Sequence, residues 1–166
     1  LVCQNATFDW VKSITPGSNE GRDLGVDQNG NILTVGLVRS TADFDPNGGT
    51  FNLTSNGLRD GYMQKLNSNG MFMLANTIGG VDDDFSLSVT SDSKGNIITT
   101  GFFRDTVDFN PSSVLMKYVS KGEGDIFIQK IDATGTLNWA NQIGGVGIDL
   151  GLQIAVNNND DVIALG

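Results

Sequence analysis

Histidine is absent from this sequence of 166 residues, and Cys3 is its single cysteine. Without histidine the chain cannot use Ser-His-Asp or Cys-His catalysis, a histidine-ligated zinc site or a histidine pH switch. One cysteine cannot form a disulfide within the chain. The reactive side chains that remain are mainly carboxylates, with 19 Asp and Glu residues in total. Composition therefore leaves carboxylate chemistry and cation binding open.

Residues that favour long helices are also scarce. Glu occurs only at positions 20 and 123, and charged residues make up 17% of the chain. Glycine is abundant, with 22 residues, a mixture typical of short strands joined by tight turns. The sequence contains no apolar stretch of 18 residues, so no transmembrane helix is predicted.

The charge of the chain is strongly negative. The formal net charge is −9 and the isoelectric point is about 4.2. The ten basic residues are scattered and form no basic arm. Because phosphate binding needs clustered Lys and Arg, nucleic acid is not an expected partner. An acidic surface suits solubility or the binding of cations.

The first residues could be the remainder of a secretion signal. Leu1-Val2-Cys3 is weakly similar to a lipoprotein box, although Val2 is bulky where a small residue is expected. An ordinary mature N-terminus is the simpler interpretation, and lipidation of Cys3 stays open.

The chain repeats itself with a period of 65 residues. Residues 19–101 align with 84–166 without a gap, and about a third of the aligned positions are identical. The opening motif "FDWVKSIT" matches the start of the later copies when the alignment is shifted by one residue. We therefore divide the chain into repeats at about 8–72, 73–137 and 138–166, the last of them partial.

Each repeat contains the pattern of four short strands. Alternating β-branched and aromatic residues, separated by turns such as "NG" and "ATG", predict strands near 85–91, 96–103, 125–132 and 136–143. Four short antiparallel strands form one blade of a β-propeller. The expected fold is therefore all-β, with residues 1–166 forming part of one propeller domain. It is incomplete, with about two and a half blades and partial strands at both ends.

Each repeat is longer than four strands and their turns require. The surplus lies at 39–57 and 104–122, between the second and third strands of each blade. We interpret it as an extra hairpin on one face. The shared motif "DF-(D/N)-P" predicts a fixed turn there, because Pro46 and Pro111 restrict the backbone.

The recurring motifs "W…IGG…D", "D..GN(I)…TG", "VDF.P" and "S.G..D.F..K" resemble the seven-bladed β-propeller repeat, or SBBP repeat, of secreted bacterial proteins. The resemblance covers almost the whole chain. It implies a propeller in an exported or cell-surface protein, usually with an adhesive or scaffolding role. Many relatives of this kind carry a C-terminal sorting domain, and none is visible here.

Residues that recur in both copies are expected to maintain the blade. We assign Asp125 and Lys130, with their counterparts Asp60 and Lys65, to the framework, because a carboxylate at a strand start commonly accepts turn N–H groups. Trp139, like Trp10, is expected to pack between blades rather than to form a sugar platform. The "IGG" glycines predict a strand end with close approach of neighbouring chains.

Asp43, Asp45 and Asn47 form the candidate metal site. With the glycine that follows them they match the D-x-D-x-N-G opening of a calcium loop. Thr54 occupies the position of the usual bidentate Glu, and the second copy, "DFNPSSV", lacks two of the ligands. The alternatives are a Ca²⁺ site and a plain Asx-Pro turn, and no other cofactor is expected.

The stretch "VDDD" at 81–84 is a second acidic feature that the other copy does not share. Three adjacent carboxylates invite a cation, but successive strand side chains alternate in direction and at most two can converge. We interpret it as a solvated acidic loop.

The functional prediction is a non-enzymatic propeller module for adhesion, scaffolding or protein–protein interaction, secreted or on the outer cell surface. No catalytic residue is predicted. The alternatives are a carboxylate-dependent glycan-active enzyme, which needs only two carboxylates, and cargo of a surface export machine. The expected ligand is a surface protein or glycan. The open blade faces should be covered by the remaining blades of the same chain, by another copy or by a partner.

Overall fold

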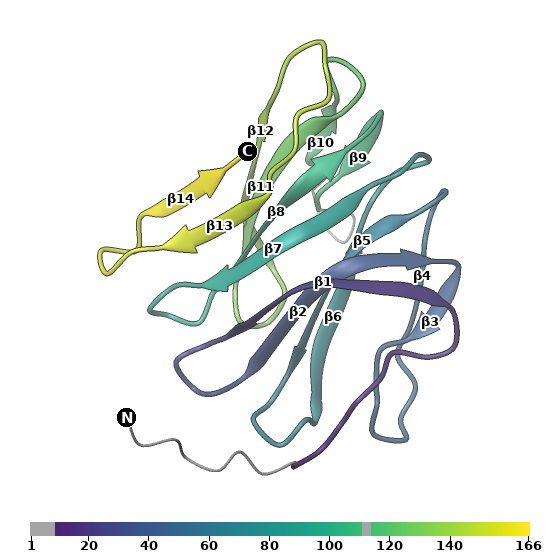
Figure 1. The fold of residues 1–166 in the computed structure, drawn as a ribbon, viewed down its shortest axis with the longest axis vertical. Coiled ribbons are helices and arrows are strands. Elements are labelled where there is room, and N and C mark those ends of the chain that lie inside the picture. Colours follow the sequence, from purple (N-terminus) through teal and green to yellow (C-terminus); the bar gives the residue numbers. More distant parts are fainter. Residues whose placement is uncertain (1–8, 111–113) are drawn as a thin grey trace, which may run out of the picture.

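The computed structural model describes residues 9–110 and 114–166, and these residues form strands and turns without any helix. Two four-stranded antiparallel sheets and one lone hairpin lie side by side like the blades of a fan (Figure 1). None of the described residues forms a helix long and apolar enough to cross a membrane. The all-β, blade-like architecture predicted from the sequence is confirmed.

The first sheet consists of β1 (Ser18–Val26), β2 (Ile32–Arg39), β5 (Asp60–Leu66) and β6 (Phe72–Ile78), paired in that order. The second consists of β7 (Phe85–Ser91), β8 (Ile97–Phe103), β11 (Asp125–Ile131) and β12 (Leu137–Ile143). The third contains only β13 (Gln153–Val156) and β14 (Val162–Leu165). The strands predicted near 85–91, 96–103, 125–132 and 136–143 are confirmed.

The surplus of each repeat forms a two-stranded hairpin, as predicted. One hairpin pairs β3 (Thr41–Asp43) with β4 (Asn52–Thr54), and the other pairs β9 (Thr106–Asp108) with β10 (Lys117–Val119). Both follow the second strand of their sheet and lie on the right-hand side of Figure 1. Pro111 lies outside the described residues.

The N-terminal segment is the one place where the strand prediction is wrong. Residues 9–17 form no strand and make a single antiparallel bridge, between Thr15 and Asp43. The corresponding strands β6 and β12 are held along their length by β5 and β11. Among the described residues no strand pairs with the N-terminal segment in this way, so the segment forms no continuous ladder of backbone hydrogen bonds.

The sheets begin and end at 18–78 and 85–143, whereas the repeats assigned from the sequence begin at 8, 73 and 138. The second assigned repeat therefore starts in β6, the fourth strand of one blade, and ends just after β11, the third strand of the next. The period itself is preserved, since β5 and β6 lie 65 positions before β11 and β12.

Clusters of apolar side chains pack between neighbouring sheets. Leu33, Val35 and Met63 of the first sheet form one buried cluster with residues of the second sheet that include Ile97 and Ile131. A further cluster joins the second sheet to the lone hairpin, with Ile98, Ile128, Ile154 and the partly buried Trp139. The expected blade-to-blade packing of Trp139 is confirmed. Each sheet thus depends on its neighbours for its core.

The "DF" motif of the short hairpins is explained by packing against the sheet. Phe44 is fully buried and contacts Tyr62 edge to face, with ring centroids 5.1 Å apart. Phe109 packs on the corresponding Phe127 with the two rings tilted, at a centroid distance of 5.4 Å. Gln64 also donates to the carbonyl of Phe44 at 2.7 Å. The aromatic residue anchors each hairpin to its blade.

Gly36 and Gly101 lie where the first two strands of each blade approach most closely. A Cβ atom on either glycine would lie 1.8 Å from a backbone carbonyl oxygen, that of Glu20 or of Phe85. Both positions lie beside a β-bulge in the partner strand. The repeat therefore keeps glycine at this place for steric reasons.

We predict that Gly101→Ala lowers the free energy of unfolding by about 1–3 kcal/mol, because the added methyl group overlaps a backbone carbonyl. Gly145→Ala is the matched control, since a Cβ atom there meets nothing within 4 Å. Urea unfolding of the two variants and the parent chain measures the difference. Equal midpoints for Gly101→Ala and the parent would contradict this account of the bulge.

Candidate functional site

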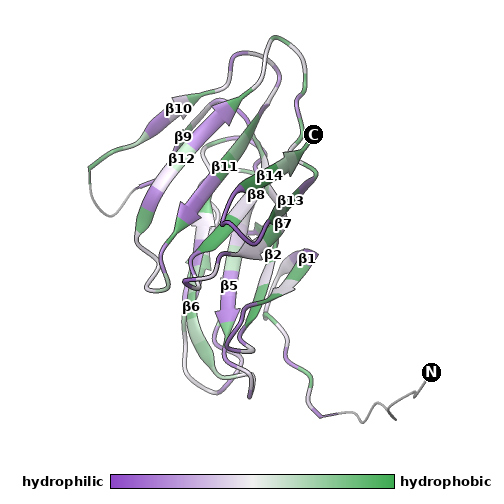
Figure 2. Ribbon diagram, turned by 90° about the vertical axis from the view of Figure 1, so that its left-hand side faces the viewer, coloured by the Kyte–Doolittle hydropathy of each residue, from purple (hydrophilic) through white to green (hydrophobic). Residues whose placement is uncertain are grey.

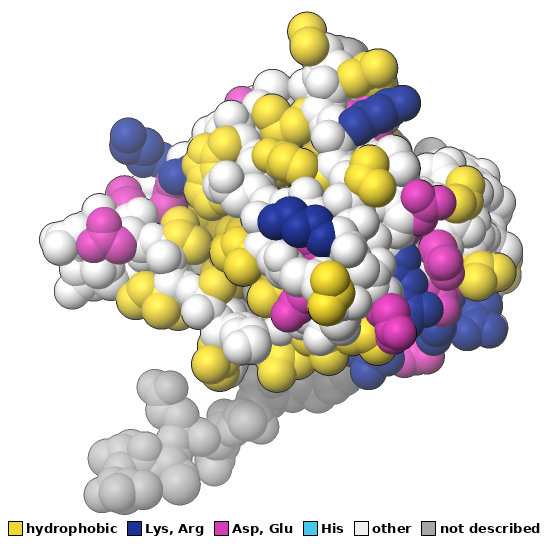
Figure 3. Space-filling view, turned by 90° about the horizontal axis from the view of Figure 1, so that it is seen from above, with side chains coloured by type: hydrophobic (Ala, Val, Ile, Leu, Met, Phe, Trp, Pro, Cys, Tyr) yellow, Lys and Arg dark blue, Asp and Glu magenta, His cyan; other side chains and the backbone are white. Residues whose placement is uncertain are grey.

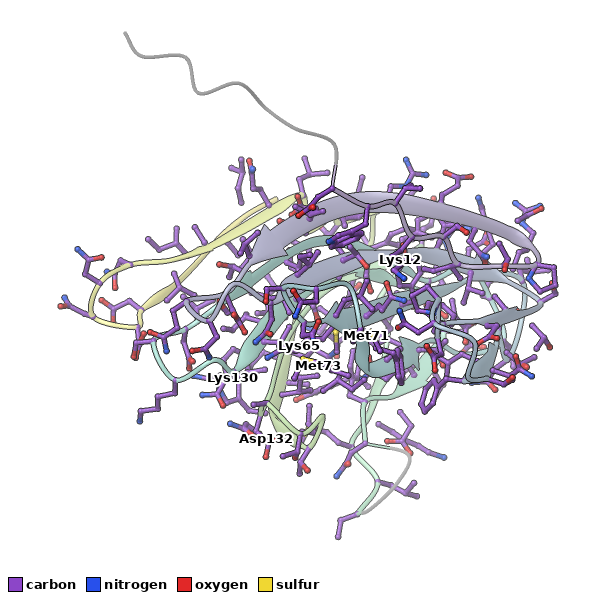
Figure 4. The ribbon with its side chains drawn as sticks, turned by 90° about the horizontal axis from the view of Figure 1, so that it is seen from below. Lys12, Lys65, Met71, Met73, Lys130 and Asp132 are labelled. Carbon is purple, nitrogen blue, oxygen red and sulfur yellow. The ribbon has the colours of Figure 1, made fainter. Side chains whose placement is uncertain are left out.

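The lysines that recur in the repeat form buried ion pairs with the turn between the first two strands. Lys65 Nζ lies 3.0 Å from Asp27, and Lys130 Nζ lies 2.6 Å from Asp92. Asp27 and Asp92 are almost fully buried, and both lysines lie toward the underside of the sheets in Figure 4. Removing one partner of such a pair would leave a buried charge. The framework role predicted for the lysines is confirmed.

Each of these aspartates also organises its own turn. Asp92 accepts the backbone N–H groups of Lys94 and Asn96 and the side-chain amide of Asn96, at 2.7–2.9 Å. Burial opposes ionisation of Asp92, but the hydrogen bonds from Lys130 and Asn96 outweigh it and hold its pKa at about 2. The carboxylate is therefore charged and fully engaged within the blade.

Asp60 and Asp125 accept turn N–H groups, as predicted. Asp60 accepts from the N–H of Asn56 at 3.0 Å, and Asp125 accepts from that of Lys121 at 3.2 Å. Both carboxylates are buried. A Cβ atom on Gly79 would lie 2.3 Å from Cγ of Asp60, so the "IGG" glycine makes room for it. These carboxylates also belong to the framework.

The interpretation of "VDDD" as a solvated acidic loop is wrong. Asp84 is fully buried and accepts the N–H groups of Gly80 at 2.7 Å and Arg104 at 2.9 Å. Asp83 forms a bidentate ion pair with Arg59, and both N–O distances are 2.6 Å. The side chains of Asp83 and Asp84 bind different partners and therefore point apart. Among the described residues this stretch forms no cluster that could hold a cation. Sequence reasoning missed Arg59, which has no counterpart in the other repeat.

The environment of Asp84 raises its pKa to about 7, mainly through burial, while the hydrogen bonds from Gly80 and Arg104 act in the opposite direction. A carboxyl group with such a pKa is what a glycan-active enzyme needs as general acid. However, Asp84 exposes none of its surface, so a substrate cannot reach it in this conformation. Its geometry fits a structural link between adjacent blades.

The structure places Asp43, Asp45 and Asn47 in consecutive turns of the β3–β4 hairpin. Asp43 accepts the N–H groups of Phe51 and Asp45 at 2.8 and 2.9 Å, and these hydrogen bonds lower its pKa. Asp45 accepts the N–H of Asn47 at 2.9 Å. This is the arrangement of an Asx turn.

The side chain of Asn47 is engaged at both ends. It donates to the carbonyl of Gly70 at 3.1 Å and accepts the N–H of Phe72 at 2.8 Å. Among the described residues, no group of three or more His, Cys, Asp and Glu side chains is arranged to hold a metal ion. Calcium binding by this loop stays a prediction, and binding would compete with these hydrogen bonds.

A hollow of about 870 Å³ opens on the uncovered face of the first sheet. Its lining includes Trp10, Ile14, Asn19 and Tyr62. The side-chain oxygen and nitrogen of Asn19 are buried there without a hydrogen-bond partner among the described residues. Asn19 occupies the position that Asp84 occupies in the second blade, where a preceding blade supplies Gly80. The hollow is therefore an unfilled blade interface rather than a preorganised ligand site.

Polar contacts that sequence reasoning missed join residues about one repeat apart. Asp23 accepts from the hydroxyl of Ser88 at 2.7 Å, and Ser88 accepts the N–H of Ile154 at 3.3 Å. At the turns, Ser93 donates to Asp160 through both its N–H and its hydroxyl. Because these residue types differ between copies, self-alignment could not identify them.

No family model matches the chain. It is 32% identical over 115 residues to an uncharacterised WD repeat-containing protein of Acanthamoeba polyphaga mimivirus, an alignment that covers 61% of this chain and 8% of the viral protein. The chain thus spans a small fraction of the length of the curated relative that it matches. Together with the four-stranded blades, this similarity identifies a repeat of the β-propeller type.

We predict that the protein loses stability as the pH rises from about 4 to 7. The pKa of Asp84 is raised from 3.8 to about 7 in the folded chain, so over this range the unfolded state releases a proton that the folded state retains. The Asp84→Asn variant lacks this titration, and its melting temperature should depend less steeply on pH. Parallel slopes for variant and parent would remove Asp84 as the cause.

If Ca²⁺ binds to the β3–β4 hairpin, titration calorimetry should detect heat with the parent chain and none with Asp45→Ala. The matched control is Asn110→Ala, which changes the corresponding position of the other hairpin and should leave the heat unchanged. Equal heats for the parent and Asp45→Ala would eliminate this loop as the site.

Proposed function

We propose that this chain is a non-enzymatic propeller module that binds protein partners and belongs to an exported or cell-surface protein. The main support is that the buried carboxylates serve the framework. Asp27, Asp60, Asp84, Asp92 and Asp125 are all buried, and each accepts hydrogen bonds from the protein itself. A scaffold of this kind leaves its outer loops free to vary.

The variable surface consists of the two short hairpins. Their framework residues recur, but their exposed residues differ between the repeats. The β9–β10 hairpin exposes Val114, Leu115 and Val119, with 82%, 62% and 57% of their surface accessible. The region of the β3–β4 hairpin exposes Leu58 (60%) and Phe51 (38%). Exposed apolar side chains on a rigid base suit a protein partner better than a charged ligand.

Export, a bacterial source and an adhesive role rest on the resemblance to SBBP repeats. The absence of histidine and the acidic surface agree with a non-catalytic exported module, but they carry less weight. The similarity to a WD repeat-containing protein supports the propeller and adds no partner. A glycan-active enzyme is the competing proposal, and Asp84 would be its most suitable acid if a conformational change exposed it.

The test compares binding with catalysis on the same set of variants. The chain is immobilised and incubated with solubilised envelope proteins of the producing organism, and bound proteins are quantified. We expect Val114→Ser with Leu115→Ser to reduce capture of a specific protein at least about tenfold. Leu24→Ser with Val26→Ser, on another exposed apolar surface, is the matched control and should retain binding.

In parallel, turnover of a glycan panel is measured for the parent and for variants in which Asp43 or one of Asp82 to Asp84 is replaced in turn. The proposal predicts no turnover by any of these proteins. Turnover that one such replacement abolishes would establish the enzyme instead.

A further inference from the structure

A largely closed cavity of about 180 Å³ lies between the first and second blades. It is bordered by β6 of the first sheet on one side, and by β11, β12 and the β9–β10 hairpin of the second blade on the other (Figure 2). Its polar lining includes Asn76 from β6 and Gln129 from β11. The cavity is therefore enclosed by two complete neighbouring sheets.

Gln129 brings an unused hydrogen-bond donor to this cavity. The residue is 2% exposed, and its Nε2 atom has no hydrogen-bond partner within residues 9–110 and 114–166. In the first blade the equivalent Gln64 donates to the carbonyl of Phe44 at 2.7 Å, and its Oε1 lies 3.3 Å from the hydroxyl of Thr34. Thr99, the counterpart of Thr34, has a buried hydroxyl that also lacks a partner in the described part of the chain. Gln129 therefore makes neither of the hydrogen bonds that hold its counterpart.

Asn76 brings an acceptor to the cavity from the other blade. Its Oδ1 atom is buried and has no hydrogen-bond partner in the structure as described. Buried polar groups are normally hydrogen bonded, and leaving them unpaired costs free energy. A single water molecule takes up only about 30 Å³ and would leave most of this cavity empty. The facing donor and acceptor thus point to a polar occupant larger than water.

The first blade shows which chemical group fits the equivalent place. There the carboxamide of Asn47 donates to the carbonyl of Gly70 at 3.1 Å and accepts the N–H of Phe72 at 2.8 Å. The counterparts of these two backbone positions are Gly135 and Leu137, and both line the cavity. In the second repeat a serine takes the place of the asparagine. The second blade thus keeps the backbone groups that bind a carboxamide, but its sequence does not supply one.

A primary carboxamide matches the groups around the cavity in number and type. It has two N–H donors and one oxygen that accepts two hydrogen bonds. The acceptors available to it are the carbonyl of Gly135 and Oδ1 of Asn76, and the donors are the N–H of Leu137 and Nε2 of Gln129. A carboxylate has no donor, and Asp108, which also lines the cavity, would repel it.

The outer surface is less specific than this cavity. On the face seen from above, hydrophobic, acidic and basic side chains are interspersed (Figure 3). The cavity combines its donors and acceptors with the apolar side chains of Ile78 and Phe109, which are 3% and 6% exposed. Apolar walls with a few polar groups are typical of small-molecule sites. Because a cavity of about 150 Å³ can hold benzene, this one suits a ligand of roughly four to eight non-hydrogen atoms.

We propose that the cavity between the first two blades binds a small neutral molecule with a primary carboxamide group, through Gln129 and Asn76. The carboxamide takes the place that Asn47 occupies in the first blade. The ligand is a free molecule rather than a protein side chain, because the cavity is largely closed. This site goes beyond the proposed protein-binding function, which uses exposed side chains. Because the ligand contacts both blades, its binding stabilises the folded chain.

The first experiment titrates acetamide, propionamide and isobutyramide into the full 166-residue chain, and NMR follows the side-chain NH2 signals of Gln129 and Gln64. We expect saturable shifts for Gln129 but not for Gln64, with a rise in melting temperature. Propionate, N,N-dimethylacetamide and a Gly-Gln-Gly peptide are the controls and should not bind. The absence of a saturable shift with every free amide would leave water as the occupant and overturn the proposal, whether or not the peptide binds.

A matched pair of variants tests the donor. Gln129→Met removes the donor with little change in volume, and it should weaken propionamide binding about tenfold through the loss of one hydrogen bond. Gln64→Met changes the equivalent position of the first blade and should leave propionamide binding unchanged.

A further variant returns the carboxamide to the chain. Ser112 is the serine at the position of Asn47, and it lies outside the described residues. Ser112→Asn should lose propionamide binding and raise the melting temperature, because its side chain takes the place of the ligand. Ser112→Ala is the control and should bind as the parent does. Undiminished binding by Ser112→Asn or by Gln129→Met would place the amide elsewhere and overturn the proposal.

Discussion

The structure depends on the burial of each sheet against its neighbours. A four-stranded blade of this chain has apolar side chains on both faces, and one sheet cannot cover either face of itself. Leu33 and Met63 of the first sheet are buried only because the second sheet contributes Ile97 and Ile131 to the same cluster. The hairpins follow the same rule, since Phe44 and Phe109 are buried by the sheet beneath them. The architecture is therefore a stack whose stability is shared between neighbours.

Within this stack, buried charged side chains stabilise the blades through ion pairs and hydrogen bonds. Lys65 and Lys130 neutralise turn carboxylates at one end of the blades, and Asp84 links the end of one blade to the next. A buried carboxylate is stable only when it is hydrogen bonded or paired. The acidic composition, which by itself suggests metal binding or catalysis, thus has a structural explanation for its most buried members.

Much of the fold could be predicted because the two copies of the repeat can be compared with each other, which separates recurring positions from variable ones. Residues kept at a spacing of 65, such as Asp125 and Lys130, proved to be framework residues, and alternating patterns located the strands. The burial of Asp84 was missed although the repeat indicates it. Of the three carboxylates at 82–84 only Asp84 recurs, as Asp149, and Asp149 accepts the N–H of Gly145 as Asp84 accepts that of Gly80. The third blade exchanges the residue types of one turn: Asn157 donates to Asp161 where Asn96 donates to Asp92 in the second blade. A position-by-position comparison counts this exchange as two differences, so it was also missed.

The N-terminal segment shows the limit of the same reasoning. Its phrase matches the fourth strand of a blade, and Ile14 packs at the edge of the first sheet's cluster much as Ile78 packs in that of the second. Yet it forms no ladder, because a strand requires a partner in space as well as a pattern in sequence. Sequence similarity specified where the segment lies but not its secondary structure.

The most direct test of this account is amide hydrogen exchange measured strand by strand in the 166-residue chain. If neighbouring sheets provide the stability, the slowest amides should belong to β5, β8 and β11, which lie inside sheets and contribute to the clusters between them. The amides of β14, which has one paired edge and one open face, should exchange much faster. Protection of β14 equal to that of β8 would contradict the dependence of each blade on its neighbours.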